Sequence, residues 1–475
     1  MEDNLRPYPE YKQSGLQWLD QTPAHWEVRR NGRLFSQRNE TGFPNLPILE
    51  VSLKTGVRVR DLDSKERKQI IPDRSKYKRA AQGYIAYNMM RLWQGAVGVA
   101  PIDGLVSPAY VVAKPHDEVD SRYYAYLFRT AGYMEEVNKY SRGIVSDRNR
   151  LYWDEFKQMP SLYPPPEEQT AIAGYLDGHA VLVGRFIRNK RRLIDLLNEQ
   201  KQATIERAVT RGLSPHVPLK PSGVDWLGNI PENWDVRSLK QIASVRLSGV
   251  DKHVYEGECR IRLCNYTDVY YNDLITPDMQ FMDATATSAE IASLALQKND
   301  VLITKDSETW NDIAVPALVE QDLDRVLCGY HLALLRPDPE QLVGEYLCRA
   351  LRASLLLWQF NVAASGVTRY GLSQHAIKSA VFPLPPTDEQ EIICATLCKT
   401  ISFADAAIER ARREIELIRE YRTRLIDDVV AGKLDIRHLP VPVRHLSDLD
   451  ALSEAEGDGP ESDDLEADEE VAVGG

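Results

Sequence analysis

The chain has 475 residues, of which 43% are hydrophobic and 27% are charged, and its formal net charge is −12. This length allows about three or four domains of ordinary size, each large enough to bury its own core. No segment approaches the roughly 18 consecutive apolar residues of a membrane helix, and residues 1–12 lack the apolar stretch of a signal peptide, so we expect a cytoplasmic protein.

The negative charge lies at the C-terminal end. Residues 446–475 contain twelve acidic residues and no Lys or Arg. Subtracting these twelve from the 70 acidic residues of the chain leaves 58, which equals the number of Lys and Arg residues. The rest of the chain is therefore neutral overall, and the low pI does not exclude nucleic acid as a partner. The tail contains no aromatic residue, and we predict that it is disordered.

Two motifs occur twice along the chain. The opening motif, Ser14 to Arg29, has the pattern Ser-Gly-x-x-Trp-Leu-x-x-x-Pro-x-x-Trp-x-Val-Arg and recurs from Ser222 to Arg237. The closing motif, Pro165-Pro166-Glu167-Glu168-Gln169, recurs as Pro386-Thr387-Asp388-Glu389-Gln390. Repeats this far apart indicate a duplicated domain followed by a spacer. Two similar domains suggest a target with two parts.

Each half contains strand-like segments followed by a helical segment. In the first half, the predicted strands lie in residues 83–90, 96–100 and 109–113, and the predicted helix covers residues 121–140. In the second half, the predicted strands lie in residues 300–304, 313–319 and 332–336, and the predicted helix covers residues 342–358. Both domains are therefore expected to be α+β.

The charged stretch after each closing motif carries an apolar stripe with helical spacing. From Ala404 onward the steps of the second stripe alternate between four and three residues, which is the heptad pattern of a coiled coil. We predict two long helices that pack on each other through Phe186, Leu193, Leu197, Ile408, Ile415, Ile418 and Leu425. The alternative is two unrelated surface helices, each packed on its own domain.

These patterns divide the chain into five predicted regions. They are a first α+β domain (1–165), a first spacer helix region (166–215), a second α+β domain (216–385), a second spacer helix region (386–438) and an acidic tail (439–475).

Signatures of catalysis are absent from the sequence. It contains no phosphate-binding Gly-x-x-x-x-Gly-Lys-[Ser/Thr] loop, no Gly-x-Gly-x-x-Gly turn and no Gly-x-Ser-x-Gly elbow. The Asn/Asp-Pro-Pro-Tyr/Phe tetrapeptide of amino-methyltransferases is missing too. All six cysteines lie in the second half without a Cys-x-x-Cys pair, so we expect reduced thiols and no metal site. We therefore assign no catalytic residue, although a site without a recognisable motif remains open.

Basic, amide and aromatic side chains gather in polar loops of both halves. Arg, Lys, Asn and Gln can hydrogen-bond base edges, and Lys and Arg also hold phosphates. The residues predicted to contact DNA are Lys54, Arg91, Trp93, Arg142, Arg148, Asn149, Lys305, Trp310, Asn311, Ser365, Thr368, Arg369 and Tyr370. For any single residue, the alternative is a solvated surface group.

The duplicated opening and closing motifs, each pair followed by a long helical stretch, resemble those of the specificity subunits of Type I restriction-modification systems. The resemblance implies two target recognition domains that each read half of a split sequence in double-stranded DNA, separated by two antiparallel helices. It also implies two partner methyltransferase subunits that use S-adenosylmethionine, and restriction subunits that use ATP and Mg, with no cofactor in this chain. Alternatives are an orphan two-headed DNA-binding protein for modification or phage exclusion, a coiled-coil protein scaffold, or an unrecognised enzyme.

Overall fold

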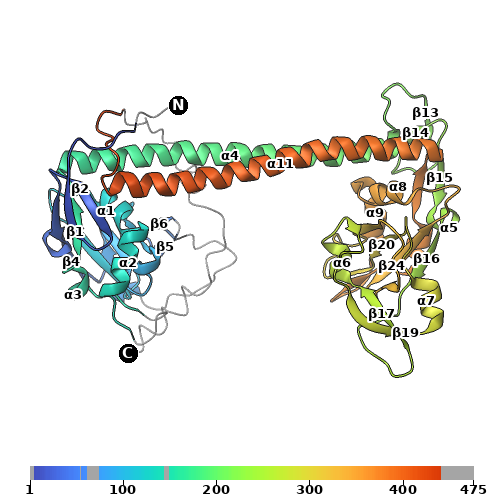
Figure 1. The fold of residues 1–475 in the computed structure, drawn as a ribbon, viewed down its shortest axis with the longest axis horizontal. Coiled ribbons are helices and arrows are strands. Elements are labelled where there is room, and N and C mark those ends of the chain that lie inside the picture. The colour runs from blue at the N-terminus through green and yellow to red at the C-terminus, as the bar shows by residue number, and fades with distance from the viewer. Residues whose placement is uncertain (1–4, 54, 61–73, 144–148, 440–475) are drawn as a thin grey trace. The chain divides into compact units, whose positions relative to one another are not determined.

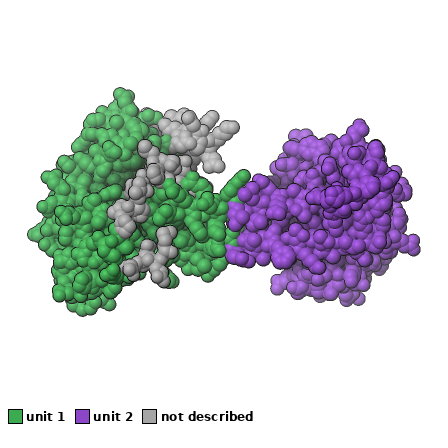
Figure 2. Space-filling model, turned by 90° about the horizontal axis from the view of Figure 1, so that it is seen from above, with its two compact units in different colours: residues 1–192, 411–475 green, residues 193–410 purple. Residues whose placement is uncertain are grey.

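The computed structural model describes residues 5–53, 55–60, 74–143 and 149–439. The chain forms two compact units, which we call unit 1 (residues 1–192 and 411–475) and unit 2 (residues 193–410) (Figure 2). Each long helix belongs partly to unit 1 and partly to unit 2. The predicted domains are instead consecutive stretches of the sequence, and their limits remain a prediction. The predicted disordered tail lies outside the described residues. Among the described residues, no helix is long and apolar enough to cross a membrane.

Unit 1 is built around an antiparallel four-stranded sheet in the order β4-β11-β8-β9. Its strands are β4 (Phe35–Arg38), β11 (Tyr110–Pro115), β8 (Ile85–Asn88) and β9 (Val97–Val99). Two short pairs adjoin it: β5 (Leu49–Ser52) with β6 (Gly56–Val59), and β7 (Lys78–Ala80) with β10 (Gly104–Val106). The predicted helix over 121–140 is two helices, α1 (Ser121–Phe128) and α2 (Ala131–Tyr140). The break occurs because the Thr130 side chain caps α2 by accepting from the Tyr133 N–H.

Unit 2 contains a five-stranded sheet in the order β16-β24-β20-β22-β18. Its strands are β16 (Ala243–Leu247), β24 (Leu332–Pro337), β20 (Val301–Thr304), β22 (Pro316–Val319) and β18 (Leu274–Ile275). A second sheet holds β19 (Met282–Ala286), β17 (Cys259–Cys264) and β23 (Val326–Cys328), and the short helices are α5 (Leu239–Ile242), α6 (Tyr266–Tyr270), α7 (Ser288–Leu294) and α10 (Gln374–Ser379). The predicted helix over 342–358 is again two helices, α8 (Gly344–Leu351) and α9 (Ser354–Ala363), because the backbone is extended at Ala353.

The opening and closing motifs pair with each other in both units. Each opening motif forms a hairpin, β1 (Tyr11–Leu16) with β2 (Leu19–Pro23) in unit 1 and β13 (Leu219–Pro221) with β14 (Asn229–Pro231) in unit 2. The next strand, β3 (Glu27–Arg30) or β15 (Asp235–Ser238), pairs with the strand before the closing motif, β12 (Pro160–Tyr163) or β26 (Val381–Leu384).

The duplication preserves the register of these strand pairs. Val28 opposes Leu162, and Val236 opposes Pro383. Val236 occupies the place in its opening motif that Val28 occupies in the first one. Leu162 and Pro383 each stand three positions before the closing motif of their unit. The same backbone partners therefore meet in both units.

The glutamine that ends each closing motif explains why the motif is repeated with the same spacing. Gln169 and Gln390 are both fully buried. The Gln169 amide donates to the Pro164 carbonyl (2.9 Å) and accepts from the Asp120 N–H (3.0 Å), just before α1. Gln390 donates to the Pro385 carbonyl (2.8 Å) and accepts from the Val343 N–H (2.8 Å), just before α8. Each glutamine therefore ties the start of a long helix to the start of another helix in the same unit, α1 or α8.

The two long helices are α4 (Pro166–Arg211) and α11 (Thr387–Val430). Each begins with two acidic residues in its first turn, which favour the positive end of the helix dipole. In unit 1 Lys190 forms an ion pair with Glu414, and in unit 2 Lys201 forms one with Asp405. The partner number falls as the α4 number rises, so the helices run antiparallel (Figure 1). The predicted α+β class with an antiparallel helix pair is confirmed.

The exposure of Leu193 contradicts its predicted place in the seam between the two long helices. Ile408, Ile415 and Leu425 are buried, and Phe186, Leu197 and Ile418 are half-buried, but Leu193 is 41% exposed. Its neighbour Ile194 is half-buried instead. Together with Val183, Ile187, Lys190, Leu197 and Lys201, it follows heptad spacing. The charged residues Lys190 and Lys201 occupy seam positions because each pairs with an acidic residue on α11. A prediction that considers apolar residues alone therefore selects Leu193 in place of Ile194.

The C-terminal end of each long helix packs on the opening-motif tryptophan of the unit in which it ends. Trp234 in unit 2 faces Gly212 after α4, and Trp26 in unit 1 faces Gly432 after α11. Both glycines have a φ of +75°, which favours glycine, and a Cβ at Gly432 would lie 2.5 Å from the Pro23 side chain. The Tyr123 hydroxyl donates to the Val430 carbonyl (3.1 Å), and the Tyr346 hydroxyl donates to the Val209 carbonyl (3.3 Å). Each core thus includes the end of the helix that begins in the other unit.

Replacing either closing-motif glutamine by leucine should destabilise one unit selectively. In Gln390→Leu, the Pro385 carbonyl and the Val343 N–H lose their buried partner. Unpaired buried groups cost about 1–3 kcal/mol each, so the free energy of unfolding of unit 2 should fall by about 2–4 kcal/mol. Gln169→Leu should have the same effect on unit 1. Calorimetry can measure both, with the exposed Gln297→Ala as control, and a change below about 0.5 kcal/mol would contradict the assigned role.

Candidate nucleic-acid interface

One end of the five-stranded sheet of unit 2 brings together segments that are far apart in the sequence. Lys305 follows β20, and His331 precedes the neighbouring strand β24. The Lys305 N–H donates to the His331 carbonyl (3.0 Å). The Gly329 N–H donates to the Cys264 carbonyl (2.9 Å) at the end of β17, just before α6. The sheet therefore fixes the backbone of the loop after β20 against that of the loop before β24.

A second pair of short strands adds the polar loop before α10 to this sheet end. β21 (Asp306–Ser307) pairs with β25 (Tyr370–Gly371), and the Leu372 N–H donates to the Lys305 carbonyl (2.8 Å). The exposed residues Ser365, Thr368 and Arg369 precede β25. The Arg369 guanidinium is close enough to the Tyr266 hydroxyl to oppose the effect of burial, which raises the pKa of that hydroxyl. The predicted residues from these two loops therefore share one edge.

Tyrosines that the sequence analysis missed lie on the same edge. Tyr266 and Tyr270 on α6 are stacked with ring centroids 5.4 Å apart, and the next residue, Tyr271, is 77% exposed. The Tyr270 hydroxyl donates to the Asp312 carboxylate (2.8 Å), and this hydrogen bond raises the pKa of Tyr270 to about 12. Lys305 Nζ lies 4.7 Å from the centroid of the half-exposed Tyr330 ring. The i, i+4 spacing of Tyr266 and Tyr270 was the available signal, because it places both rings on one helix face.

We call this set the basic-aromatic edge of unit 2 and define it as Tyr266, Tyr270, Tyr271, Lys305, Tyr330, His331, Arg369 and Tyr370. Trp310 follows Lys305 in the same loop, is 43% exposed and packs edge-on against Trp358 of α9 with ring centroids 5.9 Å apart. Asn311 beside it is exposed. Exposed aromatic faces and cations suit contacts with bases and phosphates, so the edge is a candidate nucleic-acid surface.

Unit 1 has an edge of the same construction. The Leu151 N–H donates to the Met89 carbonyl (2.8 Å) after β8, as the Leu372 N–H does to Lys305 after β20. Leu151 and Leu372 stand at the same distance along the chain before the closing motif of their unit. A backbone bridge joins Arg142 to Arg150 in unit 1, and another joins Ser365 to Gly371 in unit 2. The two edges are therefore equivalent in topology.

The predicted unit 1 residues differ in how they can serve this edge. Arg142 is 76% exposed in its side chain and forms an ion pair with Glu155 (2.6 Å), and the Asn149 amide donates to the Asn138 side chain (2.7 Å). Arg91 donates to Gln94 (3.4 Å). The Trp93 indole N–H donates to the Met90 carbonyl (2.9 Å), and its ring packs against the core, so Trp93 also supports the loop. Lys54 and Arg148 lie outside the described residues.

The helix α3 (Trp153–Phe156) follows this edge in unit 1. It places Trp153 against Phe156, whose ring is fully buried and 5.0 Å from that of Tyr87 in β8. Because α3 carries Glu155, the partner of Arg142, the core packing of α3 also positions the exposed Arg142.

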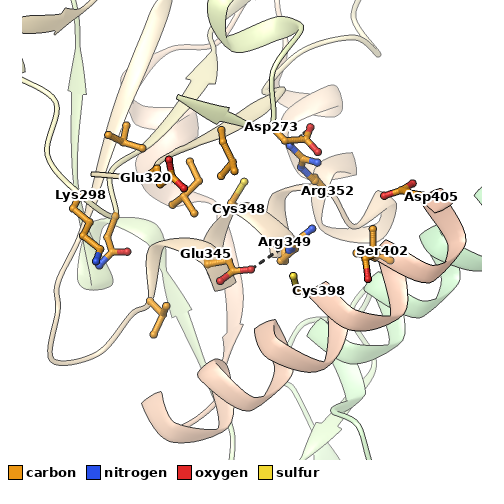
Figure 3. Close-up of a pocket in the computed structure, with 16 residues that line it drawn as sticks. Asp273, Lys298, Glu320, Glu345, Cys348, Arg349, Arg352, Cys398, Ser402 and Asp405 are labelled. Carbon is orange, nitrogen blue, oxygen red and sulfur yellow. Dashed lines mark hydrogen bonds and ion pairs between the residues drawn. The ribbon is translucent and has the colours of Figure 1, made fainter. Parts of the chain in front are cut away.

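A cavity of about 590 Å³ lies in unit 2 between α8, β22 and the first half of α11 (Figure 3). Its arginines face carboxylates: Arg352 pairs with Asp273 (2.7 Å) and Arg349 with Glu345 (3.3 Å). A cavity at the equivalent place in unit 1 contains Asp117, Glu118, Asp120, Asp177 and Arg122. Acidic residues outnumber basic ones in both linings, so neither cavity suits a phosphate backbone.

Among the described residues, no group of three or more His, Cys, Asp or Glu residues could hold a metal ion. The six cysteines form no disulfide, and burial raises the pKa of the Cys264, Cys348 and Cys394 thiols.

Comparisons with known sequences point to one family. The family described as "Type I restriction modification DNA specificity domain" matches residues 231–417. A Type I restriction enzyme MjaVIII specificity subunit of Methanocaldococcus jannaschii is 22% identical over 293 residues, which are 60% of this chain and 64% of that protein, less than two thirds of its length. A putative Type I restriction enzyme MjaX specificity subunit of the same organism is 23% identical over 449 residues, which are 88% of this chain and 96% of that protein.

Solved structures share the fold. A chain from a structure of a type I R-M system aligns with a TM-score of 0.64 and 15% identity, covering 87% of this chain and 99% of that one. The HsdS subunit from Thermoanaerobacter tengcongensis aligns with a TM-score of 0.50 and 17% identity, covering 87% of this chain and 97% of that one.

Removing a cation from the edge of unit 2 should weaken DNA binding in a salt-dependent way. Lys305→Ala and Arg369→Ala should each lower affinity, and each should reduce the slope of log affinity against log salt by about 1 if the side chain contacts a phosphate. Fluorescence anisotropy with labelled duplexes at several salt concentrations measures both quantities. The exposed Lys240→Ala on α5 serves as control. Unchanged affinity and slope in both variants would exclude these cations from the interface.

Proposed function

The chain belongs to the family of Type I restriction-modification specificity subunits, and from this premise we propose that it recognises a bipartite sequence in double-stranded DNA. Each unit reads one half-site through the edge at the end of its main sheet. The chain itself carries no catalytic group and directs partner subunits to the site.

The observation that carries this proposal is a constant frame with a variable edge. In both units the strands of the opening and closing motifs pair in the same register. The residue after β8 or β20 accepts a backbone hydrogen bond from the equivalent leucine, Leu151 or Leu372. The side chains on that loop differ, because Met89 in unit 1 occupies the place of Lys305 in unit 2. Equal frames with unlike edges support two related domains that read different bases.

The proposed partners supply the chemistry. Two methyltransferase subunits bind S-adenosylmethionine and transfer its methyl group to adenine, and restriction subunits use ATP and Mg to cut DNA. We propose that the complex acts in the cytoplasm.

Exposed apolar residues on α11 support a protein partner. In unit 2, Ile392 and Phe403 are 58% and 78% exposed. They are about three helical turns apart, so they share a face of the helix. A large aromatic ring left this open on a charged helix is typical of an interface. We propose that a methyltransferase subunit covers this face.

The proposal predicts a bipartite methylation motif. Cells expressing the chain with its methyltransferase partner should show adenine methylation at two short specific sequences separated by an unread gap, as measured by methylation-sensitive sequencing. The chain without the partner should give no methylation. A continuous unsplit motif, or methylation by the isolated chain with S-adenosylmethionine, would contradict the proposed function.

Changes on the exposed face of α11 should weaken partner binding and leave DNA binding intact. Ile392→Ala with Phe403→Ala should reduce the affinity for the methyltransferase subunit by about tenfold or more, because buried apolar area is lost. Co-purification and titration calorimetry measure the effect, with the exposed Glu391→Ala on an adjoining face as control. Full partner affinity in the double variant would place the interface elsewhere.

A further inference from the structure

We propose that His331 determines one base pair of the half-site read by unit 2, and that Asp306 positions its ring for this contact. This inference rests on the proposed function and names residues that neither the sequence motifs nor the cations of the edge identify.

The ring of His331 is held from one side by a carboxylate. His331 Nδ1 lies 2.8 Å from Asp306 Oδ2. Asp306 is itself fixed, because it opposes Gly371 in the β21–β25 pair. A Cβ at Gly371 would lie 3.1 Å from Asp306 Oδ1, so a residue without a side chain leaves room for the carboxylate. Two segments distant from His331 in the sequence therefore set the position of its imidazole.

The neighbouring tyrosine adds to this support. The rings of Tyr330 and His331 meet edge to face with centroids 4.7 Å apart, and Lys305 Nζ lies over the Tyr330 ring. The His331 backbone carbonyl accepts from the Lys305 N–H across the sheet. The His331 side chain remains 37% exposed. Its Nε2 has no hydrogen-bond partner among the described residues. The supported ring thus offers one open polar atom.

The hydrogen bond to Asp306 decides what this atom can contact. A carboxylate accepts, so Nδ1 donates to Asp306, and Nε2 is the ring nitrogen left for another contact. Nε2 accepts a hydrogen bond when the ring is neutral and donates one when the ring is protonated. The base edges in the major groove present both donors and acceptors. A ring held in one orientation suits a contact with one base edge, so we assign the contact to a base.

Unit 1 has no counterpart to this residue. Thr304 opposes Leu332 in the β20–β24 pair, and Asn88 opposes Tyr110 in the equivalent β8–β11 pair. The residue before Tyr110, equivalent to His331, is Ala109, which is buried. A contact made by His331 therefore belongs to one half-site only, and its loss should leave the other unchanged.

Replacement of His331 in the assembled methyltransferase complex tests this inference. His331→Ala should reduce discrimination at one base pair of one half-site by about tenfold or more, while every other motif position is retained in methylation sequencing. His331→Phe keeps a ring against Tyr330 without an acceptor and should relax the same position, which covers the case that the alanine variant folds poorly.

Asp306 variants separate positioning from general stability. Asp306→Asn keeps an oxygen that can accept from Nδ1 and should retain the wild-type motif, whereas Asp306→Ala should relax the position that His331→Ala relaxes. Lys240→Ala on α5, outside the edge, is the matched control, and it should leave both half-sites intact.

The outcomes distinguish the failure of this inference from that of the proposed function. An unchanged motif in both His331 variants, or equal weakening at all sequences as expected for a phosphate contact, would overturn the role of His331. Absence of a bipartite motif in the wild-type complex would instead overturn the proposed function.

Discussion

The architecture depends on the burial of each long helix's C-terminal end in the unit where the other helix begins. Val429 and Val430 at the end of α11 are fully buried in the core of unit 1, and Val209 at the end of α4 is fully buried in that of unit 2. A helix that starts in one core and ends in the other must run antiparallel to its counterpart. The heptad seam, the seam lysines paired with acidic residues and the glycines after each helix all serve this exchange.

This exchange leaves the recognition edges outside the repeated frame. Four residues of the repeated motifs are fully buried. Gln169 and Gln390 hydrogen-bond backbone carbonyls, and Trp26 and Trp234 pack in the cores, so these four positions tolerate little change. The loops after β8 and β20 are anchored by backbone hydrogen bonds, and their side chains are left to vary. A duplicated chain can therefore change what one unit contacts without altering the packing of the other. The contrast between His331 and Ala109 is one such change.

The sequence predicts what local repetition encodes. The duplicated motifs and the heptads led to the strands and the long helices, because each pattern reflects burial of one face. The antiparallel direction of the helices came instead from the family resemblance. The apolar pattern misplaced Leu193, since the seam carries Lys190 and Lys201, whose acidic partners lie on the other long helix, in the second half of the chain. It also missed Tyr266 and His331, since only the folded sheet brings α6 and the start of β24 to Lys305. The DNA contacts of the predicted site residues stay predictions.

Truncation of α11 tests the exchange of helix ends most directly. A chain that stops after Arg424 lacks Leu425, Val429, Val430 and Ile436, which belong to the core of unit 1. Hydrogen exchange with mass spectrometry should show lost protection in β3, β12 and α1 of unit 1, while β20 and β24 of unit 2 stay protected. A chain that stops after Leu439 should match the full-length protein in both. Undiminished protection of unit 1 in the shorter chain would contradict the claim that the end of α11 completes its core.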